Sequence, residues 1–400
     1  MRVTDHATGV EGRQFYLGIL ERNGGAEIRY AKALEDSHFQ PEFGPAIHLL
    51  SDLNMVLWGF PNDPKIKRLF ALVDNASLRD LLQKHWERLR LPEGFDLFKV
   101  ETAVVKYSPQ RRCTLRHVLQ LRHIETRDTT DLVIYSKTYD RKTPAGPFFR
   151  ILESLWNSPV CQSGELLFPE PLFLERELNT VFQRGLLGRN VDDMLHEIDL
   201  DHFSVAAGRA LAGLHQTSVD NLECRSIQYE IFECVKITKM LSESPHAAGL
   251  AAILSGLRER SESLPPLSPT SIHGAFRLTQ LLIVEGKLAL IDFDGFLRGN
   301  PISDAGSFVA NLLYQPMKGL ITESQSRSAI HHFCRTYRQA APWGLPPDAL
   351  RWYTSAYLAG REIRKCHDKS IKISKRDYEG MIGELLELAA AILQGKIDLA

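Results

Sequence analysis

The stretch from Ser271 to Leu313 reads SIHGAFRLTQLLIVEGKLALIDFDGFLRGNPISDAGSFVANLL, and it decides how the rest of the chain is interpreted. Its apolar runs predict two short strands, Leu281 to Val284 and Leu288 to Phe293, joined by a glycine-containing turn. The second strand delivers two carboxylates, Asp292 and Asp294, to its carboxyl end. A strand that ends in acid suits an oxygen ligand for a metal ion, although each piece taken singly is also ordinary turn chemistry.

In order and spacing, the stretch resembles the catalytic hairpin of the protein-kinase-like fold, and most of all that of the aminoglycoside phosphotransferase and choline kinase group. That group carries His-Gly-Asp, an Asn five positions after the Asp, Ile-Asp-Phe, Gly-Asp-Pro and a further Asp. The matching residues here are His273-Gly274-Ala275, Gln280, Ile291-Asp292-Phe293, Gly299-Asn300-Pro301 and Asp304. The chain departs from the pattern at the chemically decisive position, because Ala275 stands where the group has its catalytic base.

The resemblance implies a role for each matching residue. Phosphoryl transfer needs cations on the phosphates, a carboxylate that holds the metal and a carboxylate that orients the acceptor hydroxyl. Asp292 is therefore the expected Mg²⁺ ligand, with Gln280 as the second metal ligand and Arg277 as the side chain that steadies the transferred group. Ala275 cannot orient an acceptor, and Asp294 is the candidate to replace it. The loss of a positioned general base typically costs about two to four decades in rate.

Composition and charge fit an ordinary globular protein. The chain has 400 residues, 44% of them hydrophobic and 24% charged, with a formal net charge of -1. This balance predicts no nucleic-acid partner and no attraction to an anionic membrane. The six cysteines include no Cys-x-x-Cys pair, so neither a disulfide framework nor a zinc site is predicted. The sequence offers no signal core and no apolar run long enough to span a bilayer, and a cytoplasmic location is the expectation.

Upstream of the hairpin, residues 98–140 alternate in the manner of three strands, Val100 to Tyr107, Cys113 to Arg122 and Leu132 to Tyr139. This order resembles the first strands of a kinase small lobe. Lys137 falls on the third strand, where the nucleotide-pairing lysine belongs, and Glu153 on the next helix is its expected partner.

The connector that follows these strands is predicted to bind the nucleotide through its backbone. Arg184, Gly185 and Leu186 lie in a glycine-bounded linker, where backbone groups would hold an adenine ring. The fold class expected is α+β, a bilobal protein-kinase-like fold with a small antiparallel-sheet N-lobe and a mainly helical C-lobe. The expected boundaries are an N-terminal extension over 1–97, the N-lobe over 98–185 and the C-lobe over 186–400, with its catalytic hairpin at 271–294.

Local signals predict further elements. A strand is expected from Met55 to Phe60, followed by helices in which Asn75 or Ser77 supplies an N-cap. Asp304, which precedes an apolar run, is expected to cap the next helix. Helices are also expected over about 226–262, 322–339, 347–367 and 374–395. His215, in a Leu-His sequence at the end of a helix, is expected to be a core histidine and not a metal ligand.

Three functions remain open on these grounds. The first is an ATP- and Mg²⁺-dependent phosphotransferase that acts on a hydroxyl of a small metabolite of the sugar or amino alcohol class. The second is a nucleotide-binding pseudokinase that works through a protein partner, which Ala275 and Gln280 favour. The third is another transfer from ATP, such as nucleotidyl transfer, to which no residue points. The intact Asp292 and Lys137 place the phosphotransferase first.

Overall fold

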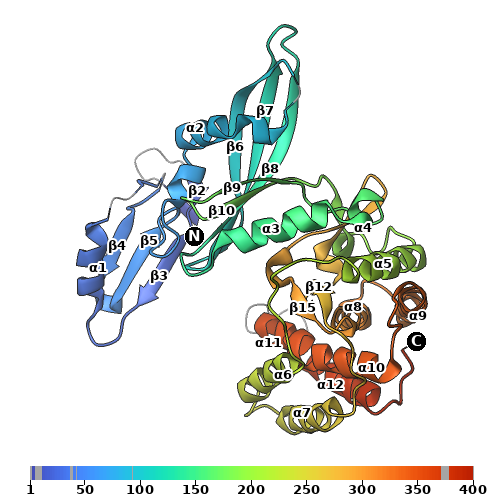
Figure 1. Ribbon diagram of the computed structural model, residues 1–400. Helices are drawn as coiled ribbons and strands as arrows, with labels where there is room; N and C mark the ends of the chain where they lie inside the picture. The colour runs from blue at the N-terminus through green and yellow to red at the C-terminus, as the bar shows by residue number, and fades with distance from the viewer. Residues whose placement is uncertain are drawn as a thin grey trace. The chain divides into compact units, whose positions relative to one another are not determined.

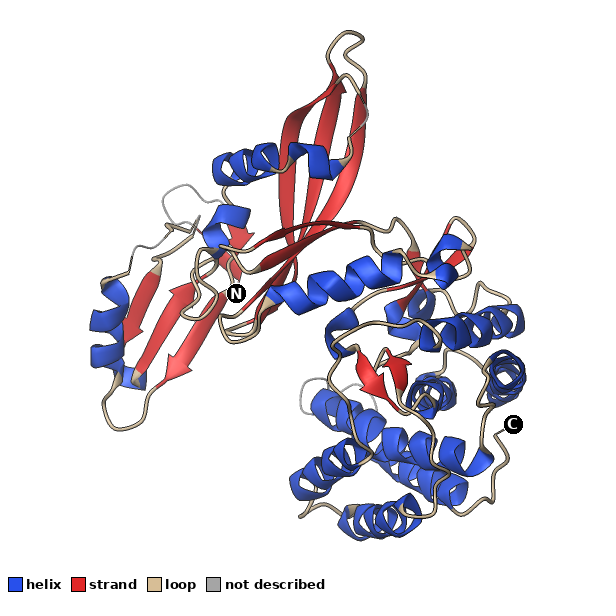
Figure 2. Ribbon diagram, in the orientation of Figure 1, coloured by secondary structure: helices blue, strands red, loops and turns tan. Residues whose placement is uncertain are grey.

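The computed structural model describes residues 2–4, 11–36, 39–41, 43–91, 93–370 and 378–399. The chain forms two compact units: unit 1 comprises Met1–Arg150 with Glu170–Gly185, and unit 2 comprises Ile151–Pro169 with Leu186–Ala400. Figure 2 shows that strands dominate unit 1 and helices dominate unit 2. Among the described residues, no helix combines the length and the apolar character that a membrane crossing requires.

The main sheet of unit 1 is antiparallel, with the strand order β6-β7-β8-β10-β9. Its strands are β6 (Phe95–Ser108), β7 (Arg112–His123), β8 (Thr129–Tyr139), β9 (Pro171–Glu175) and β10 (Thr180–Arg184). Alternate residues of β7 are buried, so one face of this strand packs against a core. The three strands expected between residues 98 and 140 are confirmed.

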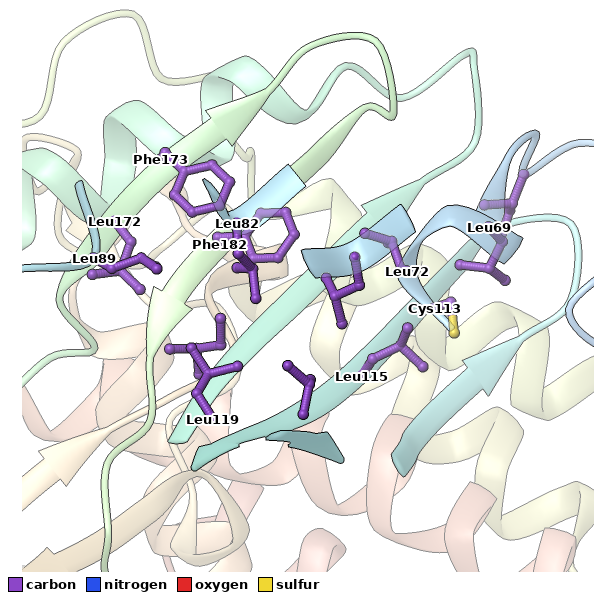
Figure 3. Close-up of a cluster of buried hydrophobic side chains, with 14 of the residues drawn as sticks. Leu69, Leu72, Leu82, Leu89, Cys113, Leu115, Leu119, Leu172, Phe173 and Phe182 are labelled. Atoms are coloured by element: carbon purple, nitrogen blue, oxygen red, sulfur yellow. The ribbon is translucent and has the colours of Figure 1, made fainter. Parts of the chain in front are cut away.

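A hydrophobic core covers one face of this sheet. Figure 3 shows Leu72 and Leu82 lying over Leu115 and Leu119 of β7. Leu72 belongs to a 3-10 helix (Leu69–Leu72), and Leu82 belongs to α2 (Asn75–Lys84). The N-cap of α2 is Asp74, whose side chain accepts a hydrogen bond from the backbone nitrogen of Ser77 at 2.8 Å. The expectation that Asn75 or Ser77 caps this helix is therefore wrong, because the aspartate one position earlier accepts the bond.

A second sheet in unit 1 has the strand order β3-β5-β4. Its strands are β3 (Tyr16–Leu20), β4 (Ile47–Leu50) and β5 (Met55–Gly59), and α1 (Ala26–Leu34) packs on them. This core has Val56 and Trp58 at its centre and is separate from the core of the main sheet. A further two-stranded pair joins β1 (Arg2–Thr4) and β2 (Glu11–Arg13).

Unit 2 is built mainly of helices (Figure 1). They are α4 (Pro159–Gln162), α5 (Leu200–His215), α6 (Gln228–Met240), α7 (Ala247–Ser261), α8 (Ile302–Tyr314), α9 (Glu323–Ala340), α10 (Pro347–Tyr357), α11 (Ile363–Ser370) and α12 (Tyr378–Leu393). The helix α3 (Ala145–Trp156) begins in unit 1 and ends in unit 2. Almost every residue of α8 is buried, so α8 forms the centre of this unit. The helices expected over about 226–262 and 322–339 are confirmed, and the one expected over 374–395 is described from Tyr378 on, because 374–377 lie outside the described residues.

One helix expected to be continuous is interrupted. Between α10 and α11 the backbone takes a π-helical turn, Leu358–Glu362. A π turn inserts one residue into an α-helix and changes the direction in which the following side chains point, and such turns are frequent at functional sites. The turn carries Arg361 and Glu362, and the helix after it carries Lys365.

The hairpin that opened the sequence analysis consists of short strands in unit 2. The hairpin itself is β13 (Leu281–Val284) and β14 (Lys287–Leu290), with β11 (Arg189–Asn190) beside β13, and a separate pair joins β12 (Thr270–Ile272) to β15 (Leu297–Gly299). The second strand ends at Leu290, three residues before the expected Phe293, because Phe293–Gly295 turns into a 3-10 helix. Asp294 therefore lies in that helix and Asp292 is its N-cap residue.

Candidate functional site

The loop that leaves β12 can only be built with a glycine at position 274. Gly274 has φ +74°, which side chains other than glycine rarely adopt. A Cβ at this position would lie 2.4 Å from the carbonyl oxygen of Gly295. The backbone at Gly274 and the backbone at Gly295 thus lie in close contact. Ala275 directly follows this contact.

The Asp304 side chain binds the backbone of this loop. Its carboxylate is fully buried and accepts a hydrogen bond from the backbone nitrogen of His273 at 2.6 Å and a longer one from that of Phe276 at 3.5 Å. His215 Nε2 lies 3.3 Å from the same carboxylate. Burial alone would raise the pKa of Asp304, but its interactions with His215 and with the backbone nitrogen of His273 outweigh burial and keep the pKa below its usual value.

Two expectations are settled by these contacts. Asp304 is not an N-cap: the N-cap of α8 is Pro301, and the Asp304 side chain bonds to the loop after β12. His215 is a buried core histidine, as expected, because Tyr337 Oη lies 2.8 Å from Nδ1 and Asp304 lies against Nε2. Among the described residues, no group of three or more His, Cys, Asp or Glu side chains is arranged to hold a metal.

His273 connects the loop to the end of β14. Its Nε2 lies 3.1 Å from the carbonyl oxygen of Ile291, the residue before Asp292. Complete burial lowers the pKa of His273, and the charge of Asp304 only partly opposes this effect. The ring is therefore neutral at physiological pH and donates from Nε2 to this carbonyl. This bond fixes the position of Asp292 relative to the loop that carries Ala275.

Asp292 and Gln280 meet at the same end of the hairpin. Leu281 pairs with Leu290, and the backbone nitrogen of Ile291 donates to the carbonyl oxygen of Gln280 at 3.0 Å. Asp292 itself has φ +68°, a left-handed conformation that is costly for a residue with a side chain. Strained backbone of this kind is concentrated at functional sites, which makes Asp292 a strong candidate.

Arg277 lies at the base of the same loop. Burial lowers the pKa of its guanidinium most, and the charge of Arg361 lowers it further, whereas Glu362 and Asp292 raise it. Its Nε is buried and makes no hydrogen bond. An arginine with an unused donor beside the metal-ligand candidate is suited to contact an anionic group.

Two candidate nucleotide-binding residues of unit 1, Lys137 and Arg184, lie on neighbouring strands of the main sheet. Lys137 lies on β8, between Thr114 of β7 and Val181 of β10. It is half-buried, so it does not simply face solvent. The Arg184 side chain is occupied by Glu170 and by the carbonyl oxygen of Leu89, which it reaches at 2.9 Å.

The connector between the units begins with a backbone contact. The backbone nitrogen of Gly185 donates to the carbonyl oxygen of Val133 at 2.8 Å. A Cβ at Gly185 would lie 2.8 Å from Val133 Cγ1, so glycine is required for this approach. Leu186 is half-buried and begins the second segment of unit 2. Glu153 is an exposed residue of α3 in unit 2, and its pairing with Lys137 stays a prediction.

Three basic residues near the loop did not emerge from the sequence. Arg361 donates to the carbonyl oxygen of Gly274 at 3.2 Å and to Ser307 Oγ at 2.8 Å. The guanidinium of Arg225 lies against Gly274, where an added Cβ would be 3.2 Å from its Nη1. Lys365 interacts electrostatically with Arg277 and Arg361. The only available sequence signal was the basic cluster REIRK at 361–365, which on a helix is as typical of a solvated face.

A surface pocket of about 450 Å³ lies elsewhere in unit 2. It is lined by His215 at the end of α5, by the segment that follows this helix, and by residues of β12 and β15, among them Thr270 and Arg298. Asp292 and Arg277 are not part of its lining. The site is therefore defined by the contacts around Gly274, Gln280 and Asp292 and not by this pocket.

The comparison with protein families identifies the class. The model of the phosphotransferase enzyme family matches residues 132–364, which is more than half of the chain, and the chain belongs to this family. The match includes Lys137, the loop at His273 and the hairpin that ends at Asp292. The family resemblance seen in the sequence is thereby confirmed. None of the curated proteins compared with the chain matches it.

Solved structures resemble this chain at low sequence identity, and one of them reaches a TM-score of 0.50. A choline kinase from Cryptosporidium parvum Iowa II matches with a TM-score of 0.50 and 12% identity, over 82% of this chain and 98% of that chain. A choline/ethanolamine kinase family protein from Mesorhizobium loti matches with a TM-score of 0.48 and 12% identity, over 78% and 94%. A choline kinase from Streptococcus pneumoniae matches with a TM-score of 0.48 and 12% identity, over 80% and 99%. The expected α+β protein-kinase-like fold is confirmed.

Proposed function

We propose that this protein is a phosphotransferase that binds ATP with Mg²⁺ and transfers the γ-phosphoryl group to a small molecule. The observation that supports this proposal most is the strained Asp292 at the end of β14, next to Gln280 and braced through Ile291 by His273. A carboxylate on strained backbone at the end of a strand is suited to hold a cation.

The residues present fit a magnesium ion. Mg²⁺ is usually bound by one or two protein oxygens together with substrate phosphates and water. Asp292 and the amide oxygen of Gln280 would hold the ion, which would neutralise charge on the phosphates. Lys137 would contact the phosphates, Arg277 would steady the transferred group, and the backbone from Arg184 to Leu186 would hold the adenine.

Ala275 bears on two parts of this proposal, the base that a hydroxyl acceptor needs and the choice between a transferase and a pseudokinase. A hydroxyl acceptor of the sugar or amino alcohol class, which the resemblance implies, needs a base, and Asp294 is the candidate from the sequence. A pseudokinase that binds nucleotide without transfer is the second candidate function, and Ala275 is the observation that favours it.

Thermal unfolding in the presence of ATP and Mg²⁺ tests the proposal. Because a ligand that binds only the folded state raises the melting temperature, ATP with Mg²⁺ should stabilise the wild-type chain and should not stabilise Asp292→Ala. Asp348→Ala, which removes an exposed carboxylate of α10, is the matched control and should behave as wild type. Release of ADP above the Asp292→Ala background distinguishes a transferase from a pseudokinase. Equal stabilisation of wild type and Asp292→Ala would contradict the metal-ligand role.

A further inference from the structure

Four cationic side chains belong to the region of the loop at Gly274. Arg361 donates to the Gly274 carbonyl oxygen, and the guanidinium of Arg225 lies against the Gly274 Cα. Arg277 is two residues after Ala275, and its charge and that of Arg361 both act on Lys365. These four side chains, called here the cation cluster, belong to four segments of unit 2: the chain before α6, the loop after β12, the π turn and α11.

Several carboxylates act on this cluster. Glu230 is buried, accepts a hydrogen bond from Tyr357 Oη at 3.1 Å and lies 3.7 Å from Arg225 Nη1. Both carboxylate oxygens of Glu362 bind Lys365, at 2.7 and 2.8 Å. Asp292 and Asp192 also act on Arg277, so carboxylates share this region with the four cations.

Some donors of the cluster are buried and unused. Arg225 Nη1 and Arg277 Nε make no hydrogen bond, although both atoms are shielded from solvent. Buried donors without partners are costly, and neighbouring like charges add to the cost. Burial lowers the pKa values of Arg277 and Lys365 most, and the neighbouring cations lower them further, whereas Glu362 raises both. An anion bound here would satisfy the donors and relieve the repulsion.

The absence of a carboxylate at position 275 bears on which acceptor can react. A neutral hydroxyl must lose a proton as it attacks phosphorus, which is the task of the family's aspartate. A carboxylate or phosphate oxygen is already anionic near neutral pH and needs no base. An aspartate at position 275 would compete with such an acceptor for the cations. Alanine has no charge and does not compete.

We infer that the acceptor of this phosphotransferase is an anion whose attacking oxygen is a carboxylate or phosphate oxygen, held by Arg225, Arg277, Arg361 and Lys365 beside Ala275. The inference rests on the proposed transfer from ATP and replaces the hydroxyl acceptor that the family resemblance implies. The acceptor oxygen forms a bond to the γ-phosphorus with its own lone pair, and the bond from that phosphorus to the bridging oxygen breaks. ADP leaves with those electrons, and no proton has to be removed from the acceptor.

Anion binding is measured first, by calorimetry on the full chain saturated with a non-hydrolysable ATP analogue and Mg²⁺. Saturation occupies the sites of the ATP phosphates, so a further anion must bind elsewhere. Inorganic phosphate and succinate are the anionic probes, and glucose and choline are the hydroxyl probes. We expect at least one anion to bind, with an affinity at least tenfold lower in Lys365→Gln and restored in Lys365→Arg. Arg364→Gln, on the same helix but half exposed, is the matched control and should change the affinity less than twofold.

Transfer is measured next, as ADP release that depends on the acceptor. Hydroxylamine converts an acyl phosphate into a hydroxamate, which identifies a carboxylate acceptor, whereas a phosphate acceptor gives a product that hydroxylamine does not trap. We expect Ala275→Asp to lower anion-dependent release at least tenfold and the uncharged Ala275→Asn to lower it less than threefold. A rise in transfer to glucose or choline in Ala275→Asp, without loss of anion-dependent release, would overturn the inference.

The two proposals fail in distinguishable ways. If ATP and Mg²⁺ do not stabilise the wild-type chain, the proposed function fails and this inference fails with it. If they do, but neither anion binds the analogue-saturated chain or only hydroxyl probes accept phosphate, the inference alone is overturned.

Discussion

The Asp304 carboxylate accepts a hydrogen bond of 2.6 Å from the backbone nitrogen of His273, although 31 positions separate the two residues. Through this bond the buried first turn of α8 sets the position of the loop that carries Gly274 and Ala275. Asp304 is thus a positioning residue, and it contacts no candidate ligand atom.

Replacement of Asp304 should be strongly destabilising. Asp304→Ala leaves the backbone nitrogen of His273 and the His215 ring without their acceptor in a fully buried place. Removal of one partner from a buried pair typically costs about 3–5 kcal/mol. Urea unfolding should therefore show a loss of this size, and Asp348→Ala, at an exposed ion pair, should change stability by less than about 1 kcal/mol. A loss below about 1 kcal/mol in Asp304→Ala would show that the loop does not depend on this carboxylate.

Gly274→Ala should cost more stability than the same change at Gly286. Both glycines have positive φ, at +74° and +77°, so the backbone strain is matched and amounts to about 1–2 kcal/mol. At Gly286 an added Cβ meets no atom within 4 Å, whereas at Gly274 it meets the Gly295 carbonyl oxygen at 2.4 Å. The difference between the two variants in the free energy of unfolding isolates the steric part. Equal losses would mean that the approach of the two segments is not tight.

The sequence predicted this hairpin because its signals are local. Strand alternation, the turn at Glu285-Gly286 and the ordered motif around Asp292 depend on residues that are close together in the chain. The strand β8 with Lys137 was predicted for the same reason. The end of β14 was predicted three residues too late, since Ile291 and Phe293 are apolar but the left-handed φ of Asp292 ends the strand.

The rest of the site depends on contacts between distant segments. Asp304 was expected to be an N-cap from its place before an apolar run, but its actual partner lies in the loop after β12. Arg225 reaches the loop from the chain before α6 and Arg361 reaches it from a π turn, and helical periodicity does not reveal such a turn. Local sequence patterns therefore do not predict the cation cluster, because its residues come together only in the tertiary structure.

Lys137 should be required for nucleotide binding and not for folding. A half-buried lysine on β8 is expected to contact phosphates, so Lys137→Met should abolish the stabilisation by ATP and Mg²⁺ while it leaves the melting temperature of the free chain within a few degrees. Lys99→Met, on the neighbouring part of unit 1, is the control because Lys99 pairs with Glu101 at the surface. Undiminished ATP binding by Lys137→Met would remove this residue from the site.

His117 should make unit 1 sensitive to acid. The ring is buried between Thr102 Oγ1 at 2.9 Å and Ser136 Oγ at 2.8 Å, and burial lowers its pKa to about 3. Because the unfolded chain binds this proton near pH 6.5 and the folded chain does not, stability falls as the pH drops from about 6.5 toward 3. Between pH 7 and 5 the loss is on the order of 2 kcal/mol. The free energy of unfolding of His117→Gln should lack this part of the pH dependence. The exposed His196→Gln is the control and should keep it. Identical pH profiles of stability for wild type and His117→Gln would show that the folded ring takes up a proton as readily as the unfolded one.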